Sequence, residues 1–318
     1  MNKINIVFMG TADFSKAVLI KLIKAGYNIS AVVTQPDRLV GRKKVLMESL
    51  VKKLALQHDI PIIQPANIKK DYQAVLDFKP DLIITAAYGQ IVPEAILEAP
   101  RLGCINVHAS LLPKLRGGAP VHYAIINGLK ETGISIMYMA KKMDAGDVIT
   151  QSKIMIESNE TVGTLYTKLT ILGADLLIQV LPDILNGTNS RTPQNESEVT
   201  FAPTIKRADE KINWNQNAQV IDCFIRGLNP SPVAYTTYLG SDIKIYAGLI
   251  HDCPNANVHH RDAECGEIVK IFNETIAIKV VDGIYLINEI QVSGKKKMFI
   301  KDLLRGNLEY FKVGNKLE

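Results

Sequence analysis

An amide and an imidazole side chain stand two residues apart in the first half of the chain. Asn106 and His108 lie in GCINVHAS, whose apolar and β-branched residues predict a strand. Side chains on a strand alternate between its two faces, so both are expected to point the same way. A hydrogen-bond donor and a group that exchanges a proton near neutral pH would then converge on one point. A pair of this kind also occurs in purely structural roles, and the pair alone leaves that alternative open.

A carboxylate follows in a later turn. Asp144 belongs to KKMDAGDVI, directly after the strand-like GISIMYM. An acidic side chain in a turn usually caps its own backbone. If Asp144 meets His108 instead, its carboxylate would orient the ring and hold its tautomer. The residues therefore offer a candidate acid–base site of Asn106, His108 and Asp144, without showing that the three groups meet.

Basic side chains gather in two places. The first is QPDRLVGRKKVLMESLVKK, whose 35–46 part contains Pro36 and Gly41 and is expected to form a loop. The second is the cluster 295–297. Such runs usually form a solvated face, and the alternative is contact with the phosphates of a nucleic acid. The residues concerned are Arg38, Arg42, Lys43, Lys44, Lys295, Lys296 and Lys297.

Two other patterns are weaker. MGTADF lacks the second glycine of GxGxxG, which disfavours a dinucleotide site and a nicotinamide dehydrogenase. HDCPNANVHHRDAEC contains residue types that bind zinc, but their spacings fit none of the usual zinc frames, and we expect no metal ion. The residues of this pattern are His251, Cys253, His259, His260 and Cys265.

Length and composition favour a globular chain of about two domains. The 318 residues are 47% hydrophobic and 22% charged, enough to bury a sizeable core. The net charge of +5 is shared by both halves, so any nucleic-acid contact must be a local patch. The cysteines form no CxxC pair, the N-terminus has no signal-peptide core, and no apolar run reaches about 18 residues. We therefore expect a cytoplasmic protein with no membrane partner.

The elements of the first half must hold the candidate pair at the end of a strand. Short β-branched runs alternate with helical patterns, which predicts an α/β fold with a mostly parallel, doubly wound sheet. Ligands bind at the carboxyl ends of such strands, where Asn106 and His108 fall. This domain is expected at 1–188 and a polar, proline-containing linker at 189–206. Short strands at regular spacing predict a small β-barrel at 207–318.

A series of motifs, in this order, closely resembles the methionyl-tRNA formyltransferase family, and the match runs nearly end to end. INVHASLLPKLRGGAP with a later DAGD is typical of folate-dependent formyltransferases broadly. QPDRLVGRKK and RGLNPSPVAYT are typical of the branch that acts on tRNA. The motifs are VFMGTADFS, VTQPDRLVGRKK, TAAYGQIVP, INVHASLLPKLRGGAP, MDAGD and IRGLNPSPVAYT.

The resemblance implies a Rossmann-like formyltransferase domain and a C-terminal OB-like β-barrel that binds tRNA. It implies transfer of formyl from 10-formyltetrahydrofolate to the amino group of methionyl initiator tRNA, by a monomer. By motif position, Asn106, His108 and Asp144 match the catalytic trio, and Arg42 matches a residue placed near the end of the acceptor stem. The segment that matches the folate-binding residues is Ser110, Leu111, Leu112 and Pro113.

The chain departs from the family pattern at three positions. Glu48 and Leu50 stand where prolines are usual, and Ser231 stands where a tryptophan is usual. Two other functions remain as alternatives. One is a formyltransferase or hydrolase acting on a small amine or on water, which would not need the basic loop and the barrel together. The other is a non-catalytic RNA-binding protein built on the barrel.

Overall fold

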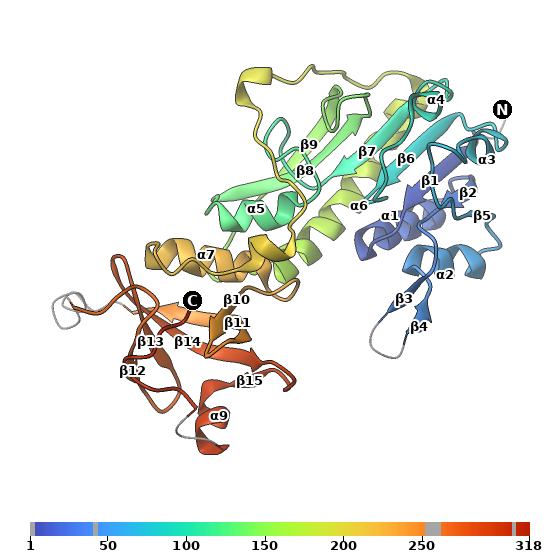
Figure 1. Cartoon of the computed structure of the whole chain (residues 1–318). Coiled ribbons are helices and arrows are strands. Elements are labelled where there is room, and N and C mark those ends of the chain that lie inside the picture. Colours follow the sequence, from blue (N-terminus) through green and yellow to red (C-terminus); the bar gives the residue numbers. More distant parts are fainter. Residues whose placement is uncertain (1–3, 41–43, 252–261, 307–309) are drawn as a thin grey trace. The chain divides into compact units, whose positions relative to one another are not determined.

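A computed structural model describes residues 4–40, 44–251, 262–306 and 310–318 (Figure 1). The chain forms two compact units. The first contains Met1–Pro120, Glu131–Ile154 and Tyr166–Ala202. The second contains Val121–Lys130, Met155–Leu165 and Pro203–Glu318. Two short segments, 121–130 and 155–165, thus belong to the second unit, whereas the sequence placed them in the first. The expected boundaries 1–188, 189–206 and 207–318 stay a prediction.

The first unit is built on a seven-stranded sheet in the order β5-β2-β1-β6-β7-β8-β9. The pairs β1–β2, β1–β6, β2–β5 and β6–β7 are parallel, and β7–β8 is antiparallel. The expected mostly parallel α/β sheet is therefore confirmed. The strands are β1 (Ile6–Gly10), β2 (Ile29–Val33), β5 (Ile62–Ile63), β6 (Leu82–Ala86), β7 (Cys104–His108), β8 (Glu131–Tyr138) and β9 (Val148–Met155).

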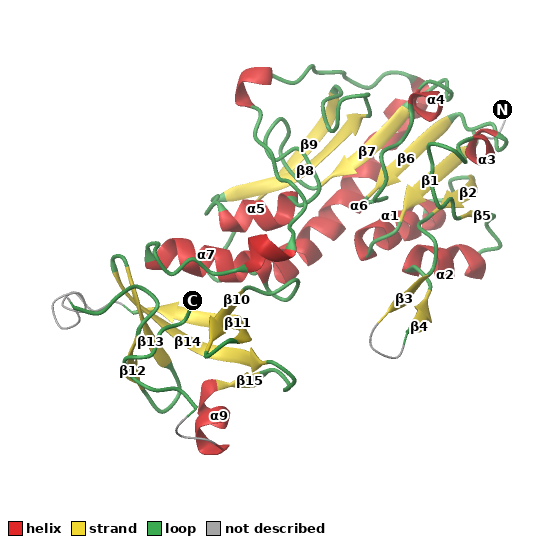
Figure 2. Cartoon of the chain, in the orientation of Figure 1, coloured by secondary structure: helices red, strands yellow, loops and turns green. Residues whose placement is uncertain are grey.

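Helices cover both faces of this sheet, because its central strands are apolar on both sides (Figure 2). On one face, Cys104 packs with residues of α3 and with Ile96 of α4. On the other face, Gly173 of α6 lies against Val107 and Ile134, where its lack of a side chain allows close approach. The helices of this part of the chain are α1 (Asp13–Lys24), α2 (Leu50–Gln57), α3 (Gln73–Leu76), α4 (Glu94–Leu97), α5 (Pro120–Ile126) and α6 (Val162–Asn186).

By length and composition alone, α6 is apolar enough to cross a membrane. It nevertheless contains Asp175 and Asp183, and its leucines Leu169, Leu177 and Leu181 are fully buried. Gly173 of the same helix lies against Val107 and Ile134, so part of this apolar helix packs on the sheet.

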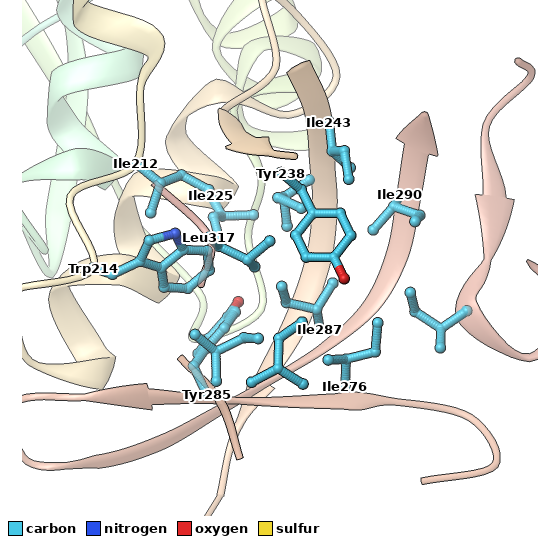
Figure 3. Close-up of a cluster of buried hydrophobic side chains, with 14 of the residues drawn as sticks. Ile212, Trp214, Ile225, Tyr238, Ile243, Ile276, Tyr285, Ile287, Ile290 and Leu317 are labelled. Carbon is cyan, nitrogen blue, oxygen red and sulfur yellow. The ribbon is translucent and has the colours of Figure 1, made fainter. Parts of the chain in front are cut away.

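The second unit contains a six-stranded antiparallel sheet in the order β10-β11-β14-β13-β12, with β15 beside β14. This confirms the expected small β domain after the α/β domain. Isoleucines line its core together with Trp214, Tyr238 and Tyr285 (Figure 3). The strands are β10 (Tyr235–Tyr238), β11 (Ser241–Ile250), β12 (Ile268–Ile271), β13 (Ile276–Val280), β14 (Gly283–Val292) and β15 (Met298–Phe299).

Helices complete the second unit. The amphipathic α7 (Ala218–Leu228) buries Ile221, Ile225 and Leu228 in the core described above. Its Gly227 lies against Ile126, at the end of α5, which explains why 121–130 belongs to this unit. The remaining helices of the described chain are η1 (Glu196–Glu198), η2 (Arg207–Glu210) and α9 (Ile300–Gly306).

Two stretches that the sequence predicted to be irregular have structure. The basic loop contains an antiparallel hairpin of β3 (Arg38–Val40) and β4 (Val45–Met47), in which Arg38 pairs with Met47 and Leu39 with Leu46. The polar stretch expected as a linker packs on the first unit through residues 189–202, which are called the connecting segment below.

Candidate active site

Asn106 and His108 lie at the carboxyl end of β7, where the register pairs Asn106 with Thr85 on β6 and His108 with Ser135 on β8. Cys104, two residues before Asn106, packs in the cluster that contains Ile96. Val107, which lies between Asn106 and His108, packs instead against Gly173 of α6. Alternation along the strand therefore puts Asn106 and His108 on one face, as the sequence predicted.

The amide of Asn106 is held from one side. Its Oδ1 lies 2.9 Å from the hydroxyl of Thr85, which is also 3.0 Å from the carbonyl of Ile105. The amide nitrogen Nδ2 makes no hydrogen bond to any residue of the described chain. Because Oδ1 accepts from Thr85, Nδ2 is the atom left to donate to a bound group.

The ring of His108 is buried, with 6% of its side chain exposed, and two acceptors flank it. Nε2 is 3.1 Å from the carbonyl oxygen of Leu115, so Nε2 carries a proton. Nδ1 is 3.8 Å from Oδ2 of Asp144. This second separation is too long for a hydrogen bond, but it places the carboxylate beside the ring. The structure thus brings together His108 and Asp144, which are separated in sequence.

Asp144 sits in a tight turn that aims its carboxylate. Its backbone is in the left-handed region, with φ of 51°, and Oδ2 accepts a hydrogen bond of 2.9 Å from the backbone N–H of Gly117. Gly117 itself has φ of 125° and faces the carbonyl of Ala202 so closely that a Cβ would lie 2.5 Å from that oxygen. The carboxylate of Asp144 is therefore held by a backbone N–H at a position, 117, where only glycine can be accommodated.

The segment Ser110–Pro113 follows the histidine and is anchored largely by its backbone. Ser110 is fully buried, and its hydroxyl donates to the carbonyl of Lys114 at 2.6 Å. The backbone N–H of Leu112 donates to the hydroxyl of Ser135 at 3.0 Å, and its carbonyl accepts from Gln151 at 2.9 Å. These bonds fix the segment as a wall next to His108.

The connecting segment was missed as part of the site by sequence reasoning. Thr192 and Val148 exchange backbone hydrogen bonds of 2.9 Å, directly after the turn of Asp144. Further along, the Thr200 hydroxyl accepts from the backbone N–H of Leu115 at 2.9 Å. The segment lacks a hydrophobic period, so only the contacts reveal that it touches both loops of the site.

Gln194 lies between these two contacts and joins the same two loops. Its side-chain oxygen Oε1 accepts from the guanidinium of Arg116. Its side-chain nitrogen Nε2 donates to the backbone carbonyls of Asp144 and Gly146. Arg116 is 1% exposed and also bonds Glu196 at 2.8 Å. The hydrogen bonds from Arg116, and then those from Lys142, lower the pKa of Glu196 to about 2.

The basic residues occupy two exposed sites, one in each unit. Arg38 and Lys44 belong to the β3–β4 hairpin, while Arg42 and Lys43 lie outside the described residues. The base of this hairpin is tied by an ion pair of 2.5 Å between Asp37 and Lys52. Lys295, Lys296 and Lys297 are exposed between β14 and β15, and Lys297 pairs with Glu289 at 2.9 Å.

The structure describes the first of the two weaker patterns fully and the second only in part. The turn after β1 is closed by its own bonds, since the backbone N–H of Thr11 donates to Ser15, and Gly10 leaves no room for a Cβ. Of the possible zinc ligands, Cys253, His259 and His260 lie outside the described residues. Within the part of the chain that is described, no group of three or more His, Cys, Asp or Glu is placed to hold a metal ion.

Comparison with known proteins gives consistent results over the whole chain. Residues 2–181 match the formyl transferase family, and residues 204–308 match the formyl transferase C-terminal domain. The chain is 51% identical to the methionyl-tRNA formyltransferase of Bacillus thuringiensis subsp. konkukian (strain 97-27), over 99% of this chain and 98% of that protein.

Solved structures share the fold at low identity. A sugar 3N-formyl transferase, WlaRD, crystallised with dTDP and 5-N-formyl-THF, superposes with a TM-score of 0.67 at 20% identity, over 93% of this chain and 100% of that one. HypX from Aquifex aeolicus in complex with tetrahydrofolic acid gives a TM-score of 0.66 at 16% identity, over 99% of this chain and 51% of that one.

Proposed function

The chain belongs to the family of methionyl-tRNA formyltransferases, which transfer the formyl group of a formyl-folate to methionyl initiator tRNA, and we propose that Asn106, His108 and Asp144 perform this transfer here. One observation carries the proposal. A buried imidazole lies between a carbonyl and a carboxylate at the end of β7, with an amide donor two residues before it.

Formyl transfer between two nitrogens makes three demands. The amine must attack without a proton, negative charge develops on the formyl oxygen, and the leaving nitrogen, N10 of the proposed donor 10-formyltetrahydrofolate, must gain a proton. Asn106 meets the second demand. Its Nδ2 donates to the developing oxyanion, and a donor in this role is worth about 3–4 kcal/mol in other acyl-transfer enzymes.

His108 meets the demand for proton transfer. Nε2 is occupied by the carbonyl of Leu115, whereas the Nδ1 position faces Asp144 at a distance too long to hold a proton tightly. We propose that Nδ1 of the neutral ring takes the proton that the attacking amine loses, and that the ring then gives this proton to N10 as the bond between N10 and the formyl carbon breaks. Asp144 lies beside this nitrogen and fixes the orientation of the ring.

We propose that a folate binds beside this pair, along the segment Ser110–Pro113. Three features define the wall: Ser110 is fully buried, Leu112 is 5% exposed, and the backbone of Leu112 is held at both N–H and carbonyl. Ser110, Leu111, Leu112 and Pro113 therefore contribute the shape of the wall through the backbone rather than free polar side chains. Holding donor and acceptor in one place adds an entropic advantage that no single side chain supplies.

The tRNA contacts are proposed at the hairpin and at the turn between β14 and β15. Arg38, Arg42, Lys43 and Lys44 come from the hairpin region, and Lys295, Lys296 and Lys297 from the turn. A guanidinium at Arg42 can neutralise a phosphate and can also stack on an unpaired base. Salt-sensitive binding with a modest net charge is consistent with a few such contacts.

The test is transfer of a labelled formyl group. The purified protein is mixed with labelled 10-formyltetrahydrofolate and with charged initiator tRNA, uncharged initiator tRNA or a small amine. We expect label only on the charged tRNA, in the aminoacyl group. Label on the small amine at a comparable rate would favour the small-amine alternative, and binding without any transfer would favour the non-catalytic one.

A further inference from the structure

Gln194 joins the two loops that meet at the candidate active site. Its side-chain oxygen accepts from Nε of Arg116 at 3.0 Å and from Nη2 at 2.8 Å. Its side-chain nitrogen donates to the carbonyl of Asp144 at 2.8 Å and to that of Gly146 at 2.7 Å. Both donors of the amide are therefore used by the turn that carries the carboxylate, and its acceptor is used by the loop that follows the histidine.

Arg116 is the buried partner of Gln194 in this arrangement, although its Nη1 has no hydrogen-bond partner among the described residues. Its side chain is 1% exposed, and a buried guanidinium is costly unless acceptors surround it. Gln194 supplies two of its hydrogen bonds and Glu196 supplies a third at 2.8 Å. Glu196 in turn accepts from Lys142, which stands in the same turn as Asp144. The loop and the turn are thus connected twice through the connecting segment.

The position of Asp144 depends on these connections. Its backbone has φ of 51°, in the left-handed region, which aspartate adopts more readily than most residues but which is still uncommon. Gln194 holds the carbonyl of this residue, and the N–H of Gly117, next to Arg116, holds its carboxylate. Loss of the Gln194 donors would release the turn from one side and let the carboxylate move away from His108.

We propose that Gln194 is a positioning residue for formyl transfer, acting through Asp144; this rests on the function proposed above. The hydrogen bonds of the Gln194 side chain go to Arg116 and to the turn 144–146, so its effect on the reaction is expected to pass through that turn. The connecting segment is then a component of the active site and not only a tether between the two units.

Gln194→Glu tests the proposal with the smallest change in shape. The carboxylate still accepts from Arg116, but it cannot donate to the two carbonyls and repels them. Single-turnover formyl transfer to methionyl initiator tRNA should fall about 10- to 100-fold, as expected for a displaced catalytic group. The dissociation constant for the tRNA should stay within about twofold. Gln194→Met, which keeps the length without charge, should lower the rate in the same direction.

A double-mutant cycle separates positioning from general structural damage. In the Asp144→Asn background, Gln194→Glu should lower the remaining rate by less than about threefold, because the carboxylate on which it acts is already gone. Gln179→Glu is the matched control. Gln179 is exposed on α6, outside the connecting segment, and the same change of amide to carboxylate there should leave the rate within about twofold.

The outcomes distinguish this inference from the proposed function. If the wild-type protein transfers formyl and Gln194→Glu does so equally fast, the role of Gln194 is refuted and the function stands. Equal losses in both backgrounds, or loss of folding in both Gln194 variants, would give the residue a general structural role and overturn the inference. A wild-type protein that transfers no formyl refutes the function itself.

Discussion

The hydrogen bonds around Asn106 and His108 decide what these two side chains can do. The amide is oriented by one hydroxyl, from Thr85, and the ring by one carbonyl, from Leu115. Each side chain therefore keeps one nitrogen, Nδ2 of Asn106 and Nδ1 of His108, without a hydrogen bond to another described residue. The residue types and the strand alternation predicted this pair from sequence. The Thr85 contact was not predicted, because a threonine in a buried strand carries no signal of its partner.

Thr85→Val should slow the reaction without changing binding. The substitution keeps the shape of the side chain and removes the donor to Asn106, so the amide can rotate away from its productive orientation. Loss of a hydrogen bond of about 0.5–1.5 kcal/mol predicts a decrease in kcat of about 2- to 12-fold. Steady-state kinetics with initiator tRNA measures this effect, and KM for the tRNA should be unchanged.

Thr132→Val is the matched control for this prediction. Thr132 is buried in β8, and its hydroxyl has no hydrogen-bond partner among the described residues. Its replacement should leave kcat unchanged and the free energy of unfolding equal or higher. A kcat for Thr85→Val that equals the wild-type value would show that Asn106 needs no support from β6.

The hairpin and the connecting segment are the elements that sequence patterns described least well. β3 and β4 are three residues each and pair only with one another, so they show neither the length nor the burial that identifies a strand. The connecting segment is held by single side chains such as Gln194 and Thr200. Such long-range hydrogen bonds leave no period in the sequence, whereas the buried strands of the sheet do.

Asp37→Asn should weaken tRNA use through the base of the hairpin. Asp37 precedes β3, and its carboxylate bonds Lys52 of α2 and Gln64, which also lower its pKa. Asp37 precedes β3 and Lys52 follows β4, so removing the charge of Asp37 weakens the ion pair that joins the two ends of the hairpin. We expect kcat/KM for initiator tRNA to fall about 3- to 10-fold, which corresponds to about 0.7–1.4 kcal/mol, the range of one ordinary hydrogen bond. The folate dissociation constant should not change.

Asp175→Asn serves as a control of equal charge change. It removes an exposed ion pair between α1 and α6, Lys21 with Asp175 at 2.6 Å, away from the hairpin. Exposed pairs of this kind contribute little, so kinetics and stability should remain near wild type. Equal losses in the two variants would attribute the effect to net charge and contradict a role for the hairpin base.

The anchoring of the connecting segment should depend on acid pH through Glu196. Its pKa is lowered to about 2 by hydrogen bonds from Arg116 and Lys142, from an ordinary value near 4.5. A lowered pKa means that the stabilisation is present above about pH 4.5 and is lost as pH falls toward 2. The difference in unfolding free energy between wild type and Glu196→Gln should therefore shrink from pH 6 to pH 3. A difference that is constant over this range would contradict the assignment.

The whole molecule combines two units with separate cores and a charge that is spread over both. The alternation of strands and helices predicted the first unit, and regular short strands predicted the second. Assignment of 121–130 and 155–165 to the second unit was not predicted. Gly163 fits against Pro230, and Gly227 against Ile126, and such close approaches between distant segments depend on packing that no local pattern records.

The salt dependence of tRNA binding should distinguish neighbouring lysines. Lys297 pairs with Glu289 and lies over the ring of Tyr246, whereas the side chain of Lys296 has no such partner among the residues described. Lys296→Ala should reduce the slope of log K against log salt by about 0.7–0.9, the value for one phosphate contact. Lys297→Ala should reduce it less. Binding titrations at several salt concentrations measure both slopes, and an unchanged slope for Lys296→Ala would place the tRNA elsewhere.

The most direct test of the proposed active site compares chemistry with binding in Asp144→Asn and His108→Ala. In the proposed mechanism both groups act at the reacting centre, so single-turnover formyl transfer to methionyl initiator tRNA should fall by about 100-fold or more. The dissociation constant for the tRNA should stay within about twofold of wild type. If either variant binds the tRNA much more weakly and still transfers formyl at the wild-type rate once the tRNA is bound, that residue has no part in the chemistry.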